Sequence, residues 1–236
     1  MIEHRPVGSL GVARHGQIDS KSHFSFAQYH DPLRMHWGVL RAWNDDAIAP
    51  GSGFLPQPQA DMEIITYVHE GAITHKDSLG NLGRTAAGDV QVVSTGTGIR
   101  HSEYNLEPGV TRIFQIWIHP SQQGALPSWG CKPFPKDERQ HRFVALASGA
   151  SGDEDALPIR ADARVLGTLL KAGETATYRF AHAGRYGYMV LAKGRAEING
   201  IALRSQDGAA IHGEREIAVT ASEDAELVLV DAAGLA

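Results

Sequence analysis

Residues 188–203 read YMVLAKGRAEINGIAL, and this stretch decides the class of fold. Asn199 and Gly200 stand between two short apolar runs, and Asn-Gly in that position is the strongest short signal for a two-residue β-hairpin turn. Gly194 interrupts the stretch earlier and predicts another tight reversal, because glycine adopts the backbone conformations that tight turns require. The stretch therefore predicts strand, tight glycine, strand, turn and strand in immediate succession.

The rest of the chain repeats this pattern. Short alternating or continuously apolar runs, bounded by Gly, Asp and Asn, recur at intervals of about ten residues, whereas helical periodicity is hard to find. The 236 residues include 26 glycines and 11 prolines, which favours a fold rich in turns. Candidate strands include 37–43, 62–74, 88–93, 111–118, 165–170 and 226–230. We predict an all-β protein built as a sandwich or barrel.

A weak internal repeat divides the chain. Gly71 in TYVHEGAITH aligns with Gly194, and residues 88–93 then align roughly with residues 207–212. A unit of about 100 residues that occurs twice predicts two similar β-barrels in tandem. The polar segment SGASGDEDALP at 148–158 is a natural connection. We place the boundary near residue 140, which gives domains at 1–140 and 141–236.

Composition and charge exclude several classes of protein. The net charge is -5 and no run of Lys and Arg reaches four residues, so direct binding to nucleic acid is not expected. The N-terminal residues lack the plan of a signal peptide, and no stretch approaches the ~18 apolar residues of a membrane span. We therefore expect a soluble cytoplasmic protein. Cys131 is the single cysteine, which excludes an internal disulfide.

His101 and Glu103 form the most suggestive pair among the twelve histidines and their acidic neighbours. Residues i and i+2 of a strand project to the same face, so both side chains can reach one metal ion. The pair follows Gly96 and Gly98, which allow a bend or a close approach of the backbone. By itself the spacing leaves two alternatives open, a pair of metal ligands and the polar end of an exposed strand.

The sequence around this pair resembles a known family. Residues 88–105, GDVQVVSTGTGIRHSEYN, resemble the second conserved motif of the cupin barrels and, more narrowly, of the pirins, which are two-domain cupins. Four further blocks follow in pirin order over most of the first 120 residues: HFSFAQYHDP at 23–32, LRAWNDD at 40–46, DMEIITYVHEGAITHKDSLGN at 61–81 and FQIWIHP at 114–120. The resemblance implies two tandem cupin (jelly-roll) β-barrels, a bicupin whose C-terminal barrel is degenerate.

The resemblance also implies a metal site, usually holding iron, in the N-terminal barrel. In pirins a His-x-His pair before the DMEI block and a later His-x-Glu pair hold the ion. Here the second pair is intact as His101 and Glu103, whereas Gln57 and Gln59 stand at the positions of the first pair. An amide oxygen is a poor ligand for iron and suits harder ions such as magnesium, calcium or manganese. We therefore expect a metal-free or weakly metallated site rather than a tight iron site.

Three further expectations concern this site. The four side chains should converge within about 5 Å of one point if they can share an ion. Without metal, the two glutamine amides are expected to hydrogen-bond His101 and Glu103. His69 and His75 lie ten or more residues beyond Gln59 on one extended ribbon, and are therefore not expected to replace a ligand.

Acidic residues near this region have predicted roles as well. Glu63 matches a residue near the metal site of the pirins, so we assign it a place behind the ligands, with an ordinary charged strand start as the alternative. Asn44, Asp45 and Asp46 could suggest an acidic metal site, but three such residues in succession predict a turn.

Two functions are consistent with the resemblance. Bacterial pirins resemble quercetin 2,3-dioxygenases, which implies a divalent metal and a small aromatic, flavonol-like ligand. Pirins are also known as redox-responsive partners of transcription factors, which implies a non-catalytic regulatory protein that binds a ligand or a protein partner. Because glutamine replaces two of the three histidine ligands, the residues of this chain argue against dioxygenase activity, and analogy of fold alone does not decide between the two.

Overall fold

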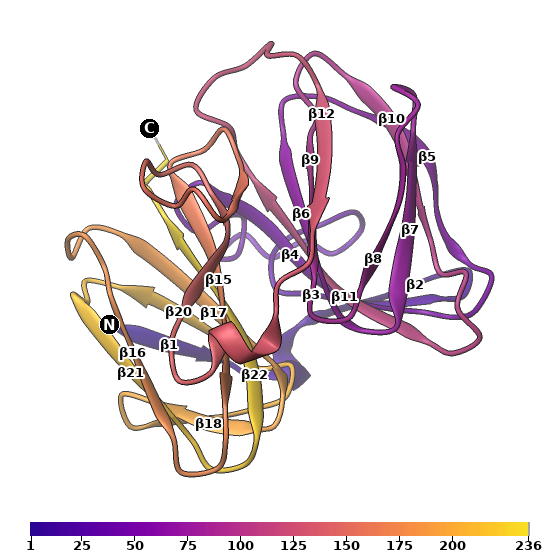
Figure 1. Ribbon diagram of the computed structural model, residues 1–236. Helices are drawn as coiled ribbons and strands as arrows, with labels where there is room; N and C mark the ends of the chain where they lie inside the picture. The colour runs from indigo at the N-terminus through magenta and orange to yellow at the C-terminus, as the bar shows by residue number, and fades with distance from the viewer. Residues whose placement is uncertain (236) are drawn as a thin grey trace.

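The computed structural model describes residues 1–235, which form 22 β-strands and two short 3-10 helices, η1 (Val7–Ser9) and η2 (Lys136–Arg139). The strands build two barrels that lie side by side (Figure 1). The prediction of an all-β fold with two tandem barrels is confirmed. No helix within residues 1–235 has the length and apolar character that crossing a lipid bilayer requires.

The N-terminal barrel is a sandwich of two sheets. The larger sheet has the order β12-β9-β6-β11-β4-β3-β2, and the smaller has the order β5-β10-β7-β8. Their bounds are β2 (Gly11–His15), β3 (Ile18–Ser22), β4 (Leu40–Ile48), β5 (Gly53–Gln59), β6 (Glu63–Glu70), β7 (Ala72–Asp77), β8 (Leu82–Ala86), β9 (Val90–Ser94), β10 (Ile99–Tyr104), β11 (Thr111–Ile118) and β12 (Ser128–Lys132).

The C-terminal barrel has the same plan. Its larger sheet has the order β1-β20-β17-β22-β15-β13-β14, and its smaller sheet the order β16-β21-β18-β19. Their bounds are β1 (Ile2–Arg5), β13 (Val144–Ser148), β14 (Leu157–Pro158), β15 (Ala163–Leu170), β16 (Thr175–Arg179), β17 (Tyr186–Lys193), β18 (Arg195–Ile198), β19 (Ile201–Arg204), β20 (Gly208–His212), β21 (Glu216–Ala221) and β22 (Ala225–Ala232). The run β9-β6-β11-β4 in one barrel corresponds to β20-β17-β22-β15 in the other, so the weak sequence repeat reflects a repeated topology.

The turns that the sequence predicted are present. Asn199 and Gly200 both have positive φ, 44° and 87°, and the flanking residues pair across a two-residue hairpin. Gly71 and Gly194, which align in the repeat, occupy equivalent turns after β6 and β17, with φ of 75° and 83°. A side chain at residue 71 would also meet Thr111 Oγ1 at 2.5 Å, so both the conformation and the space favour glycine there.

Strand β1 differs from the predicted division at residue 140. It belongs to the first predicted domain by sequence, yet it pairs with β20 and forms the edge of the large C-terminal sheet. Figure 1 shows it, in indigo, among the strands of the C-terminal barrel. By covering the edge of β20, β1 satisfies backbone groups that a strand edge would otherwise leave unpaired. The boundary near residue 140 itself stays a prediction. The predicted connection at 148–158 is wrong, because β13 and β14, at its two ends, both belong to the large C-terminal sheet.

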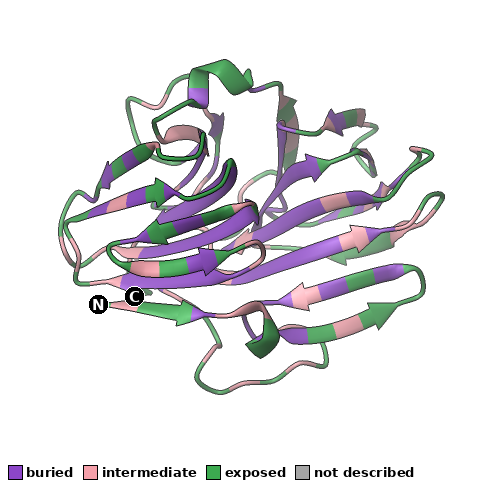
Figure 2. Cartoon of the chain, turned by 90° about the horizontal axis from the view of Figure 1, so that it is seen from below, coloured by how far each residue is buried: buried purple, intermediate pink, exposed green. Residues whose placement is uncertain are grey.

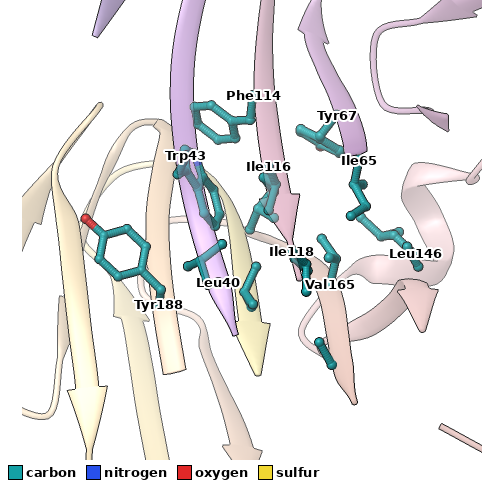
Figure 3. Packing of buried hydrophobic residues seen from close by; sticks show 14 of the residues in the cluster. Leu40, Trp43, Ile65, Tyr67, Phe114, Ile116, Ile118, Leu146, Val165 and Tyr188 are labelled. Carbon is teal, nitrogen blue, oxygen red and sulfur yellow. The ribbon is translucent and has the colours of Figure 1, made fainter. Parts of the chain in front are cut away.

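The largest apolar cluster lies between the barrels. The large N-terminal sheet contributes Trp43, Ile65 and Phe114, and the C-terminal barrel contributes Val165 and Tyr188 (Figure 3). Figure 2 shows the long central strands buried along most of their length. One face of the large N-terminal sheet therefore packs on the other barrel, which leaves its opposite face to line the inside of its own barrel.

The predicted turn at Asn44, Asp45 and Asp46 is wrong. All three residues lie in β4, between Trp43 and Ile48, and all three are buried. Tertiary packing overrides their preference for turns, because β3 and β11 pair with this strand on its two sides. Alternation along the strand directs Asn44 and Asp46 to one face and Asp45 to the other.

Candidate functional site

The predicted site residues of the first and second motifs lie on adjacent strands. β5 and β10 are antiparallel, with Gln57 opposite His101 and Gln59 opposite Ile99. Side chains of directly paired residues point to the same face of a sheet. Gln57, Gln59 and His101 accordingly line one cavity inside the N-terminal barrel.

The sequence of β5, GFLPQPQ, explains why the side-chain amides of Gln57 and Gln59 point to the same face of the strand. Pro56 and Pro58 alternate with Gln57 and Gln59, so the prolines share one face and the glutamines share the other. Proline cannot donate a ladder hydrogen bond and is tolerated because β5 is the edge strand of its sheet.

Glu103, two residues after His101 in β10, is the fourth predicted site residue. Its Oε1 lies 3.6 Å from His101 Nε2, and the side chain is fully buried. Burial raises the pKa of Glu103 to about 7, and the negative charge of Asp46 adds to the rise. The hydrogen bond that Thr66 Oγ1 donates to Glu103 Oε2 opposes it. Burial also lowers the pKa of His101 to about 4, so its imidazole is neutral at pH 7.

Three buried atoms of this group have no hydrogen-bond partner: Gln59 Oε1, His101 Nδ1 and Glu103 Oε1. The predicted hydrogen bonds from the glutamine amides to these acceptors are therefore not formed. The register between β5 and β10 slips between His101 and Glu103, so that Glu103 stands opposite Phe54 instead of Leu55.

Unpartnered buried polar atoms are rare in folded proteins and require an explanation. The ring nitrogen of His101 that lies 3.6 Å from Glu103 Oε1 is Nε2, whereas the unpartnered one is Nδ1. An imidazole, a carboxyl group and amides together offer more oxygen than iron prefers. Within residues 1–235 no three His, Cys, Asp or Glu side chains are placed to hold a metal ion together. A cation in this cavity would therefore depend on the amide oxygens as well as on His101 and Glu103.

His75 lies beside His101, although the sequence predicted that it is too far from Gln59 to replace a metal ligand. The chain reverses at Gly71, so β7 runs back along β10 and His75 stands opposite Glu103. The imidazole of His75 stacks on that of His101 with ring centroids 5.6 Å apart, and on the indole of Trp129 with centroids 4.9 Å apart. The predicted separation is wrong, because the chain does not stay extended from Gln59 to His75 but turns at Gly71.

A hydrogen bond fixes the orientation of His75. Its Nε2 lies 2.9 Å from Asp77 Oδ2, and both side chains are buried. Asp77 in turn accepts hydrogen bonds from the backbone of Leu79 and from Asn81 in the following turn. The stacked arrangement supports the ring of His101, and His75 Nδ1 is itself buried without a hydrogen-bond partner among residues 1–235.

Glu63 and His69 do not join this group. Glu63 lies on the face of β6 opposite Thr66, and it accepts a hydrogen bond from Ser94 at 2.6 Å. His69 shares that face, and its Nε2 lies 3.7 Å from Asp45 Oδ1. Both residues face the junction between the barrels.

The wall of the cavity across from the four-stranded sheet is polar. The cavity has a volume of about 610 Å³, within the range of small-molecule sites. Hydrogen-bonding residues on β3, β4 and β11 line it: Ser20, Ser22, Asn44, Asp46 and Gln115. Phe26, Phe54 and Trp117 add aromatic surface, so the cavity suits a flat ligand that carries polar substituents.

Asp46 is the second buried carboxyl group of this barrel. Burial raises its pKa to about 7, and the negative charge of Asp45 adds to the rise. The hydrogen bond that Ser20 Oγ donates to Asp46 Oδ1 opposes it. The sequence did not predict that Asp46 lines the cavity. Which face of β4 lies toward the cavity depends on the strands with which β4 pairs.

The C-terminal barrel, as far as residue 235, lacks this chemistry. β16 and β21 occupy the places that β5 and β10 hold in the first barrel. Their buried side chains include Ala176, Ile217 and Val219, which belong to the apolar core of that barrel. Packed hydrocarbon thus stands where the N-terminal barrel places amides, an imidazole and a carboxyl group.

Comparisons with known proteins agree with this architecture. Residues 4–118 match the family model described as Pirin, and residues 145–232 match that of the quercetinase C-terminal cupin domain. The chain is 64% identical to a pirin-like protein of Caulobacter vibrioides, over 99% of this chain and 100% of the relative. It is 39% identical to the quercetin 2,3-dioxygenase of Escherichia coli K12, over 98% of both chains. The crystal structure of the bacterial pirin YhhW from Escherichia coli in complex with nickel(II) superposes with a TM-score of 0.91, at 37% identity and 100% coverage of both chains.

Proposed function

This chain belongs to the pirin family and resembles the quercetin 2,3-dioxygenases, and from that premise we propose that its N-terminal barrel binds a flat, hydroxylated aromatic compound of the flavonol type beside a weakly held divalent cation. The unpartnered buried atoms of Gln59 and His101, which line the cavity, and of Glu103, whose Oε1 lies 3.6 Å from His101 Nε2, carry this proposal. Manganese or magnesium suits this mixed oxygen and nitrogen donor set better than iron.

The residues of the chain contribute binding and orientation. His101 is neutral at pH 7 and offers a nitrogen lone pair, while His75 and Trp129 hold its ring in place by stacking. Thr66 orients Glu103 by donating to one of its oxygens, which leaves the other free. A divalent cation, when bound, would act as a Lewis acid on an oxygen of the aromatic ligand. Oxygenation of that ligand is the activity that the relatives' names suggest.

A second function follows from the two glutamines. If amide oxygens hold the cation too weakly for turnover, the barrel serves as a ligand-binding module without catalysis, in a regulatory role or in binding a protein partner. The nickel-bound structure belongs to a relative at 37% identity, and it supports the capacity of this fold to hold a divalent ion.

Metal binding tests the proposal directly. We expect calorimetric titration with Mn(II), Ni(II) and Fe(II) to give weak one-to-one binding in the unmodified protein. The double variant Gln57→His, Gln59→His should bind Ni(II) and Fe(II) more tightly by more than about 100-fold. Loss of a hydrogen-bond partner of a metal ligand already lowers metal affinity about 10–100-fold, and a change of the ligand itself should have a larger effect. Glu63→Gln is the matched control, because Glu63 lies on the other face of the sheet and its loss should leave the metal affinity unchanged.

Three outcomes separate the candidates. Metal binding together with quercetin-dependent oxygen uptake supports the dioxygenase. Quercetin binding without oxygen uptake, even after loading with metal, supports the binding module. If neither metal nor quercetin binds at millimolar concentration, the proposal is wrong.

A further inference from the structure

Asn44 and Asp46 stand on the cavity wall across from β5 and β10. They are residues i and i+2 of β4, so they share one face of the strand, and both line the cavity. Their exposed fractions are 3% and 2%, which places two strongly polar side chains almost entirely out of solvent.

Their hydrogen bonds within the protein are incomplete. Ser20 Oγ donates to Asp46 Oδ1, and no group in residues 1–235 hydrogen-bonds Asp46 Oδ2. Asn44 Oδ1 is buried without any partner. Two residues of one strand that line the same cavity therefore each have an oxygen, Asn44 Oδ1 and Asp46 Oδ2, that accepts no hydrogen bond within residues 1–235. This is unusual for buried polar groups.

Asp45, between them, points to the opposite face. There Gln206 Nε2 donates to its Oδ2 at 2.8 Å, while its Oδ1, 3.7 Å from His69 Nε2, has no hydrogen-bond partner among residues 1–235. Asp45 thus joins the two barrels. Asn44 and Asp46 make no such contact with the second barrel, so packing of the barrels does not account for them.

We propose that Asn44 and Asp46 form a polar anchor that accepts hydrogen bonds from ring hydroxyls of the aromatic ligand, across the cavity from His101. The inference rests on the proposed function and adds to it the residues that select hydroxylated ligands. Trp117 and Phe26, with ring centroids 5.1 Å apart, supply apolar surface between the two walls.

The anchor can be tested with a pair of flavonols. Quercetin carries two adjacent hydroxyls on its pendant ring, and galangin has the same keto-enol edge without them. We expect the unmodified protein to bind quercetin about tenfold or more tightly than galangin, in fluorescence titrations at pH 7 with and without Mn(II). Asp46→Ala and Asn44→Ala should each reduce this ratio toward one by weakening quercetin binding, while the dissociation constant of galangin stays the same.

Galangin binding is the internal control for folding, because a variant with a damaged barrel would lose both ligands. Asp19→Asn, at an exposed position of the neighbouring strand β3, should keep the ratio of the unmodified protein. If the variants weaken both flavonols equally, or leave the ratio unchanged, the anchor is refuted while the binding site stands. If the unmodified protein binds neither flavonol, the proposed function itself fails.

Discussion

Asp46 and Glu103 are carboxyl groups buried in the same barrel, and burial raises the pKa of each to about 7. Such groups destabilise the folded state when they are charged, so their presence in a cavity wall is more readily explained by binding than by stability. At this scale the sequence was informative about His101 and Glu103, because spacing along a strand fixes a shared face. It was uninformative about Asp46, because nothing local determines what a strand faces.

Replacing Asp46 by asparagine should stabilise the protein at alkaline pH. A carboxyl group whose pKa is about 7 in the folded state and 3.8 in the unfolded chain stabilises the fold below pH 3.8, and it loses that contribution as the pH rises through 7. Asparagine resembles the protonated group and does not titrate. We expect Asp46→Asn to raise the midpoint of thermal unfolding by roughly 5–10 °C at pH 8.5, and by less than half as much at pH 4.5.

The exposed Asp19 provides the comparison for this experiment. Asp19→Asn should change the midpoint little at either pH, since that side chain is 70% exposed. Equal shifts for Asp46→Asn at pH 4.5 and pH 8.5 would show that the carboxyl group does not titrate as its burial requires.

Among the elements, β8 and β12 determine how His101 is supported. Gly83 of β8 lies against Trp129 of β12, and a Cβ atom at Gly83 would come within 2.1 Å of the indole ring. The indole stacks on His75, which stacks on His101. The two sheets of the barrel therefore meet through a stack of three rings, and a glycine makes room for it.

Gly83→Ala should disturb this stack. The added methyl group forces the indole to move, and overpacking of this kind costs about 1–3 kcal/mol of unfolding free energy. Because the displaced Trp129 no longer holds His75 in place, Mn(II) affinity should fall as well. Chemical denaturation and metal titration measure the two effects. Gly109→Ala is the control, because a side chain there meets open space; a Gly83 variant that matches it in both measurements would refute the role of the stack.

For the whole molecule, the junction between the barrels is part of the core. Tyr67 of the first barrel donates a hydrogen bond to Glu226 of the second, and Arg139 Nη1 donates to the Tyr67 hydroxyl at 3.3 Å. Arg139, in the 3-10 helix η2 between β12 and β13, also donates to the carbonyl of Gly88 at 3.0 Å. These polar contacts border the apolar cluster of Figure 3, so the two barrels are expected to unfold together.

Removing the Tyr67 hydroxyl should weaken this junction. In Tyr67→Phe the buried Glu226 and Arg139 lose a shared partner, which we expect to lower the free energy of unfolding by about 1–3 kcal/mol. The loss should not add to that of Glu226→Gln, and the double-mutant cycle should give a coupling of about 1 kcal/mol. Tyr104→Phe is the control, because Tyr104 lies in β10 beside the cavity of the N-terminal barrel, away from this junction. Strictly additive losses would show that the two side chains do not interact.

The sequence by itself determined the all-β class, the hairpin at Asn199 and Gly200, the repeat aligned on Gly71 and Gly194, and the pairing of His101 with Glu103 on one face. These features depend on turn chemistry and on the two-residue period of a strand, both of which are local. Only the tertiary structure decided that β4 passes through Asn44, Asp45 and Asp46, that His75 returns beside His101, that Glu63 faces away and that β1 joins the second barrel. Each of these depends on which strands become neighbours, and strand pairing joins residues far apart in the chain that no local pattern relates.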